Sequence, residues 1–134
     1  MGVRVSLLSL FASVVLSGCW SAAEPSLRSA VVIRNASTVA LTDVHVITAP
    51  GDELTDASIA AGATIAARAV HAVYGNIHVT ARVGNQPVSV IPIEGFADGF
   101  NTRLPDGTYT VVLVVHTEPD GIHWLEASVD PGGA

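Results

Sequence analysis

The sequence predicts an all-β fold for residues 30–130, an antiparallel β-sandwich of seven to eight strands. Three observations predict it. Short runs rich in Val, Ile and Thr alternate with turn residues along the whole segment. Residues 77–83 alternate apolar and polar side chains with a period of two, as a strand with one buried face does. Two Pro-Asp-Gly turns, at 105–107 and 119–121, enclose an apolar run of strand length.

The first strands are separated by polar turns. Residues 30–34 form a short strand that ends at the Asn35-Ala36-Ser37 turn, which matches a glycosylation sequon but is read here as a turn. Residues 41–48 alternate between an apolar and a mainly polar face and end at the turn 49–52. These two segments therefore predict two half-buried strands.

Residues 57–73 admit two interpretations. Apolar side chains recur at helical spacing, at Ile59, Ala63, Ala66, Val70 and Val73. A helix there would make the fold α+β, but Gly62 would cost that helix about 1 kcal/mol. In the other interpretation residues 61–63 form a turn and residues 64–70 form a strand, and this one is favoured.

The remaining strands are predicted as hairpins. Gly84-Asn85 links residues 77–83 to a strand at 88–93, which Pro87 and Pro92 place at a sheet edge. Residues 108–117 are apolar on both faces in the middle, as in a central strand with both faces covered. Residues 122–129 return as its partner, and residues 131–134 are expected to be a frayed tail.

The N-terminus has the pattern of an export signal. Arg4 is followed by twelve mainly apolar residues, 5–16, which are too few for a bilayer core that needs about 20. The run ends in Leu16-Ser17-Gly18-Cys19, which resembles the lipobox of bacterial lipoproteins. That resemblance implies cleavage after Gly18, so that residues 1–18 are a signal peptide. It also implies acyl chains on Cys19, which hold the chain on a membrane.

The segment after the cleavage position predicts a tether and a location. Residues 19–29 are small, polar and Pro-containing, so we expect them to link the lipid to the domain. Cys19 is the only cysteine, which excludes an intramolecular disulfide. Trp20 follows it, where Asp would resemble an inner-membrane retention signal. The resemblance therefore implies the outer membrane in a cell that has one, and otherwise the exterior of the cytoplasmic membrane.

The composition of the chain argues against nucleic acid as a partner. Removing residues 1–18 from the 134-residue chain leaves 116 residues, enough for one domain. The removed part contains Arg4 and no acid, so the formal charge of −6 becomes −7, and the sequence contains no lysine. An acidic chain with scattered arginines does not suit nucleic acid, which needs a clustered basic face. The membrane contact is expected to be the lipid anchor.

The domain also resembles known sandwich modules. The segments 31–37, 41–46, 61–64 and 75–81 look like the bacterial surface Ig-like modules that are often linked to adhesion. Residues 104–111 are similar to the Gly-x-Tyr-x-Val strand of those modules and of transthyretin-like domains. The resemblance implies an Ig-like or transthyretin-like sandwich. The resemblance does not decide whether the partner is an envelope protein or a glycan.

Histidines are the only candidate metal ligands. The five are His45, His71, His78, His116 and His123. His45 and His78 point to the polar side of their strands, so they could meet across a sheet and hold Cu or Zn. This predicts, as the alternative function, a periplasmic metal-binding lipoprotein.

The sequence predicts no enzyme. It has no Gly-x-Ser-x-Gly, His-Glu-x-x-His or phosphate-loop motif, and no cofactor beyond the lipid is expected. Asp43 and His45 supply half of a catalytic triad at most. The carboxylate pairs Asp52/Glu53 and Glu94/Asp98 fall in turn-like segments, where they are expected to be solvated.

One loop is the best candidate for contact with a partner. Phe96 and Phe100 lie in a Gly-flanked segment of a chain that is poor in aromatic residues. In the alternative interpretation, the two rings plug one end of the sandwich. Trp124, which alternates with Ile122, is expected in the core. The predicted function is a non-catalytic binding or structural module of the cell envelope, anchored by lipid.

Overall fold

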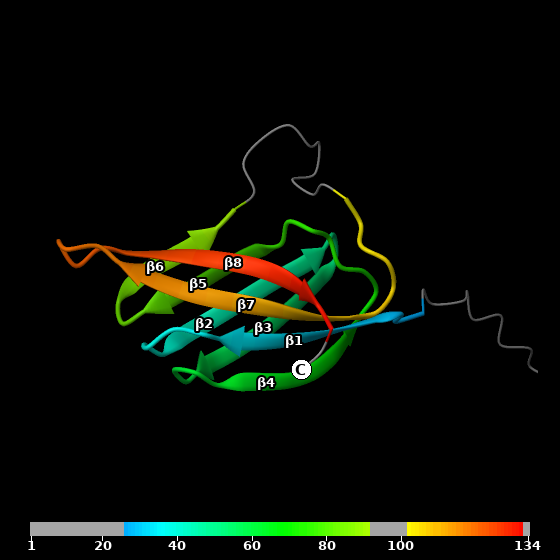
Figure 1. Ribbon diagram of the computed structural model, residues 1–134, viewed down its shortest axis with the longest axis horizontal. Helices are drawn as coiled ribbons and strands as arrows, with labels where there is room; N and C mark the ends of the chain where they lie inside the picture. Colours follow the sequence, from blue (N-terminus) through cyan, green and yellow to red (C-terminus); the bar gives the residue numbers. More distant parts are fainter. Residues whose placement is uncertain (1–25, 92–101, 133–134) are drawn as a thin grey trace, which may run out of the picture.

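The chain forms a two-layer β-sandwich. A computed structural model describes residues 26–91 and 102–132, which contain eight strands and no helix (Figure 1). The strands are β1 (Ser29–Asn35), β2 (Leu41–Ala49), β3 (Asp52–Ile59), β4 (Thr64–Val70), β5 (His78–Val83), β6 (Gln86–Val90), β7 (Thr108–Thr117) and β8 (His123–Pro131). One sheet has the order β4-β1-β7-β8 and the other β3-β2-β5-β6. The predicted all-β sandwich is confirmed.

The strand order differs from that of one expected sandwich type. In an Ig domain of the constant type the first two strands lie in the same sheet. Here β1 and β2 lie in different sheets. The pairing of β1 with β7 is parallel, whereas the other five pairings are antiparallel, so the sandwich is not wholly antiparallel. The order therefore departs from that of a constant-type Ig domain.

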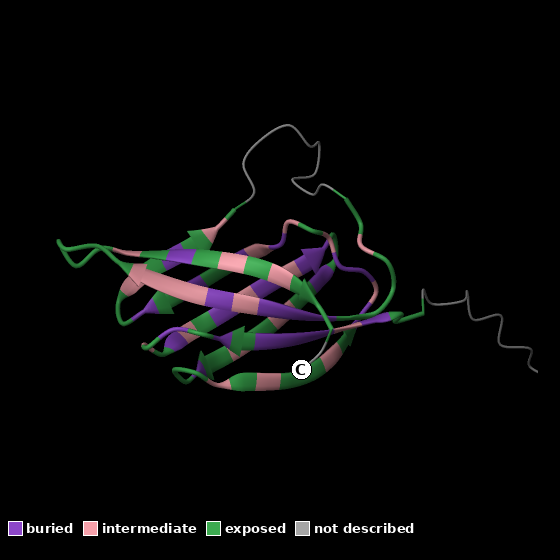
Figure 2. Cartoon of the chain, viewed as in Figure 1, coloured by how far each residue is buried: buried purple, intermediate pink, exposed green. Residues whose placement is uncertain are grey.

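Small aliphatic side chains fill the space between the sheets. Alternate residues of each strand point inward, and Figure 2 shows this as alternating buried and exposed bands. The fully buried apolar residues are Val31, Ile33, Leu41, Val44, Val46, Ile59, Val73, Val79, Val111 and Leu113. Valine and isoleucine suit both the strand backbone and a thin core, because their branched side chains pack well on a pleated surface.

The ambiguous segment 57–73 consists of strands and a turn. β3 ends at Ile59 and β4 runs from Thr64 to Val70, which confirms the strand interpretation. Gly62 has a φ of +73°, a conformation that glycine adopts without the cost of a Cβ. The helical spacing of the apolar residues in the segment 57–73 is therefore a coincidence in an alanine-rich sequence.

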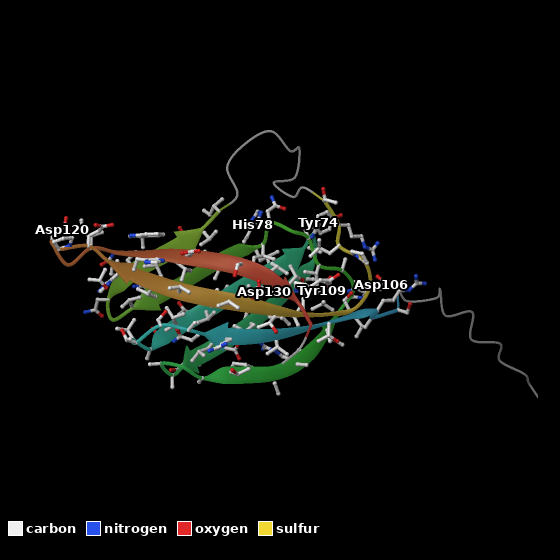
Figure 3. All side chains as sticks on the ribbon, in the orientation of Figure 1. Tyr74, His78, Asp106, Tyr109, Asp120 and Asp130 are labelled. Carbon is white, nitrogen blue, oxygen red and sulfur yellow. The ribbon has the colours of Figure 1, made fainter. Side chains whose placement is uncertain are left out.

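The predicted hairpins are present with small changes. Gly84-Asn85 joins β5 to β6, and β6 is an edge strand, as Pro87 predicted. Pro92 lies outside the described residues. The turn before β7 is held by the phenol of Tyr109, which donates to the carbonyl oxygen of Pro105 at 2.6 Å (Figure 3).

The C-terminal segment is longer than predicted. β8 continues to Pro131, and Gly132 donates to the carbonyl oxygen of Thr108 (2.8 Å), while its own carbonyl oxygen accepts from the Thr110 hydroxyl (2.8 Å). The predicted fraying is therefore wrong for residues 131–132, and residues 133–134 lie outside the described part. These bonds hold the end of the chain against the start of β7.

β7 is central, as predicted, but only one of its faces is fully covered. Tyr109, Val111 and Leu113 point into the core and are buried. Val112 and Val114 point outward and are only half-buried, because no further layer lies on that sheet in the part of the chain described (Figure 2). The prediction that both faces of this strand are covered is thus wrong for the outer face.

β1 starts at one end of the sandwich, and the β7–β8 turn lies at the opposite end. β1 begins at Ser29, one residue inside the expected tether, and the Ser29 hydroxyl accepts a hydrogen bond from the Gly107 amide at 3.2 Å. Asp106 lies at this end and Asp120, in the β7–β8 turn, lies at the opposite end (Figure 3). The described residues include no helix capable of spanning a membrane.

Candidate functional site

The two histidines predicted as metal ligands lie on neighbouring strands. His45 is in β2 and His78 is in β5, both on the outer face of their sheet. The register pairs His45 with Thr80 and His78 with Ile47, so the two histidines are diagonal neighbours. Diagonal positions lie about 7–8 Å apart, which is still within reach of long side chains, so the occupancy of the ring nitrogens matters more than the register.

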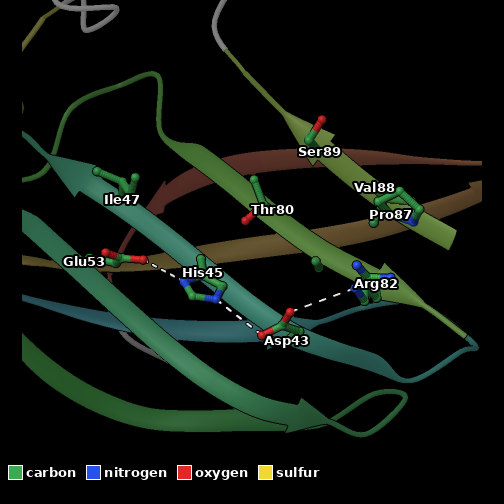
Figure 4. A pocket seen from close by; sticks show the side chains of 10 residues that line it. Asp43, His45, Ile47, Glu53, Thr80, Arg82, Pro87, Val88 and Ser89 are labelled. Carbon is green, nitrogen blue, oxygen red and sulfur yellow. Dashed lines mark hydrogen bonds and ion pairs between the residues drawn. The ribbon is translucent and has the colours of Figure 1, made fainter. Parts of the chain in front are cut away.

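His45 is held between two carboxylates. Its Nδ1 lies 2.6 Å from Oε1 of Glu53 and its Nε2 lies 3.4 Å from Oδ1 of Asp43 (Figure 4). Asp43 has a φ of +51°, and the β2–β5 register shifts by one residue at this point. The bulge therefore aims the Asp43 carboxylate along the sheet surface toward His45.

The surroundings of His45 raise its pKa above 6.5. The main cause is the hydrogen bond with Glu53, and the hydrogen bond with Asp43 acts in the same direction. Arg82 faces the same Asp43 carboxylate, with its Nε 3.9 Å from Oδ2. Both ring nitrogens have an acceptor, so the site favours the protonated imidazolium, and this form cannot bind a metal ion.

A raised pKa in the folded chain makes its stability depend on pH. The stabilisation that protonated His45 provides is fully present below pH 6.5 and is lost as the pH rises through the folded-state pKa. We expect the wild type to lose stability relative to His45→Gln between pH 6 and pH 8.5. Thermal unfolding of both proteins across this range measures the difference.

The Glu53→Gln variant is the control for this pH dependence. It removes the main cause of the shift, so the His45 pKa should return toward 6.5, which an NMR titration of the ring protons reports. A His45 ring that titrates below pH 6.5 in the wild type contradicts the assignment.

A shallow groove of about 490 Å³ surrounds His45 on this face (Figure 4). Its lining comes from β2, β3, β5 and β6 and mixes polar side chains with apolar ones such as Ile47 and Val88. The principal polar side chains are those of Asp43, His45, Glu53, Thr80, Arg82 and Ser89. The groove can hydrogen-bond a small polar group, and both ring nitrogens of His45 already contact carboxylates.

The other histidines also have partners. His71 Nδ1 lies 2.7 Å from Asp52 Oδ1, and His116 Nε2 lies 2.8 Å from Glu126 Oε2. His123 Nδ1 lies 2.8 Å from the Thr117 hydroxyl. Across residues 26–91 and 102–132, no three His, Cys, Asp or Glu side chains are grouped so as to hold a metal ion. The geometry therefore offers no observation that favours the metal-binding alternative.

Sequence reasoning missed the role of the Asp52/Glu53 pair. These residues begin β3 and are not in a solvated turn; Asp52 is buried and Glu53 contacts His45. His71, the partner of Asp52, is 19 residues away in the sequence, and His45, the partner of Glu53, is 8 residues away. The alternation of β2 points to His45 as an outward residue, but only the β2–β3 register places Glu53 beside it.

Trp124 lies on the surface and not in the predicted core. It is 44% exposed, and Ile122 is also exposed. Its indole stacks on the ring of His116, its cross-strand partner, with centroids 4.0 Å apart and planes at 15°. Its Nε1 donates to Oε1 of Glu118 at 2.9 Å. The core position in β8 is taken by Leu125, because the alternation of this strand is offset by one residue from the prediction.

Several predicted site residues fall outside the described part of the chain. They are Cys19, Phe96 and Phe100, together with the Glu94/Asp98 pair.

Comparisons with known proteins inform the fold. No family model and no curated protein matches the chain. A solved structure described as the NMR structure of the protein from Eubacterium rectale is similar, with 12% sequence identity and a TM-score of 0.54. The match covers 82% of this chain and 94% of that one. At this identity the likeness supports the β-sandwich and says nothing about activity.

Proposed function

We propose that the protein is a lipid-anchored module of the cell envelope, held on a membrane through Cys19. Its β-sandwich binds or supports another envelope component without catalysis. The signal pattern at residues 1–19 supports the anchor. Acyl chains on Cys19 provide stable attachment at about 0.8 kcal/mol for each buried methylene.

The observation that carries the binding role is the position of the exposed Trp124. β1 and β7 are parallel and start at the same end, where residue 30 pairs with residue 108. His116 lies eight residues farther along β7, about 26 Å from that end at 3.3 Å per residue, and Trp124 lies opposite it on β8. The aromatic pair is therefore at the end of the sandwich opposite the start of β1, which leads back to the proposed anchor.

The anchoring part is tested by replacing Cys19. We expect the wild-type chain to incorporate a clickable palmitate analogue in bacterial cells and to sediment with membranes. Cys19→Ala should incorporate none and should leave the membrane fraction, because no acyl chain can then be attached. Ser21→Ala, two residues away, is the matched control and should behave as the wild type. Absence of label on the wild type contradicts the proposal.

A further inference from the structure

The outer face of β7 and β8 carries an apolar strip that ends at an aromatic pair. Val112, Val114 and His116 point outward from β7, and Trp124 lies beside His116 on β8. Residues 111–115 are all apolar, a pattern typical of strands covered on both sides, but this side is open in the described chain. Val112 and Val114 are half-buried and lie opposite polar residues of β8, Ser128 and Glu126, so the strip adds a small apolar contact next to the aromatic pair.

Trp124 is preorganised for contact. Stacking on His116 covers one face of the indole, and the bond from Nε1 to Glu118 fixes its rotation. β8 is the edge strand of its sheet, so no further strand of that sheet lies beyond Trp124. A fixed, partly exposed tryptophan loses little side-chain entropy on binding, which is why tryptophan dominates many binding hot spots.

Charge around the ring indicates what it binds. Glu118 and Glu126 both lie beside the pair, and Glu126 contacts His116 at 2.8 Å with its side chain 57% exposed. A lysine or arginine over the indole would gain a cation–π contact and the attraction of both carboxylates. The cation on the same face, Arg34, pairs with Val112 in register, at the other end of the strip.

We propose that this face docks a protein segment that combines apolar and basic side chains. Its apolar residues cover Val112 and Val114, and a lysine or arginine lies against Trp124 between Glu118 and Glu126. The inference rests on the proposed function, since it names the class of partner that the anchored module holds.

Photo-crosslinking in intact cells tests the docking. Benzoylphenylalanine is placed at Ser128, an exposed outer position opposite Val112, in the full-length chain. Ser89, exposed on the outer face of the other sheet, is the matched control position. We expect a discrete protein adduct from position 128 and none from position 89. Trp124→Ala should reduce the adduct at least tenfold, and Trp124→Phe should restore part of it.

Two carboxylate variants test the basic partner. Glu118→Gln with Glu126→Gln should weaken the adduct about fivefold, whereas Asp106→Asn should leave it unchanged. Asp106 is a fair control because it is also an exposed carboxylate and lies at the other end of the sandwich. The chain has no lysine, so carbodiimide crosslinks between its carboxylates and lysine must reach another protein. We expect such a crosslink to the same partner.

The outcomes separate this inference from the proposed function. Three results would overturn the docking of a basic segment and still leave a binding module. The adduct could form at position 89 alone, or it could survive Trp124→Ala. It could also be destroyed by glycan-cleaving enzymes but not by protease. Absence of any adduct from both positions overturns both. Thermal unfolding should show that Trp124→Ala is folded, as expected for a side chain on the surface.

Discussion

Replacement of Asn35 by alanine is expected to lower the free energy of unfolding by about 3 kcal/mol. The side chain is fully buried at the end of β1. Its amide group donates to the carbonyl oxygens of Val39 (2.9 Å), Ile59 (3.1 Å) and Ala60 (3.3 Å), and its Oδ1 accepts from the Ser37 amide (3.0 Å). Alanine leaves these buried groups without partners, which costs more than the bonds themselves contribute.

Asn35 matters because it connects the two sheets. β1 belongs to one sheet, and Ile59 ends β3 in the other. Ser37, which Asn35 positions, accepts a bond from the Val115 amide of β7 at 2.7 Å. The single amide therefore joins the β1–β2 turn, the end of β3 and, through Ser37, the central strand β7.

Chemical denaturation measures this loss. Asn35→Asp tests the donor role, because a carboxylate oxygen would then face carbonyl oxygens, and we expect it to be at least as destabilising as alanine. The matched control is Asn85→Ala, an exposed turn asparagine, whose effect should stay within about 0.5 kcal/mol. Wild-type stability in Asn35→Asp contradicts the assigned donor bonds.

Local patterns predicted most of the fold because they act over a few residues. The strand at 108–117, the strand at 64–70 and the Gly84-Asn85 turn were predicted with the bounds that the structure shows. Each depends on turn chemistry and on alternation with a period of two, which neighbouring residues determine. The parallel pairing of β1 with β7 joins residues about 78 apart, and no local pattern indicates it.

The candidate site was predicted less well, since it depends on register and backbone conformation. Sequence alternation placed His45 and His78 on the polar faces correctly, but the pairing offsets them diagonally. The positive φ of Asp43 is a property of the folded strand that an Asp allows but does not require. Trp124 was misassigned to the core because the alternation of β8 was counted from Ile122, which lies before the strand begins.

Replacement of Asp52 by alanine is expected to cost about 2–4 kcal/mol. Its side chain is 8% exposed and carries three contacts across the sandwich. Oδ2 accepts from the amides of His71 (3.0 Å) and Ala72 (3.1 Å), and Oδ1 contacts His71 Nδ1 (2.7 Å). Together with the Asp56–Arg68 ion pair at 2.7 Å, these contacts close the side of the sandwich where β3 and β4 lie.

The contrast between Asp52→Ala and Asp52→Asn identifies which contact matters. In the asparagine variant the remaining oxygen can still accept from both backbone amides, and the new amide group can donate to His71 Nδ1. We therefore expect Asp52→Asn to cost less than half as much as alanine in denaturant unfolding at pH 8. Glu53→Ala, the next residue and also a histidine partner, is exposed and should cost under 1 kcal/mol. If Asn and Ala were equally destabilising, the charge on Asp52 would matter more than its bonds to the backbone amides of the segment after β4.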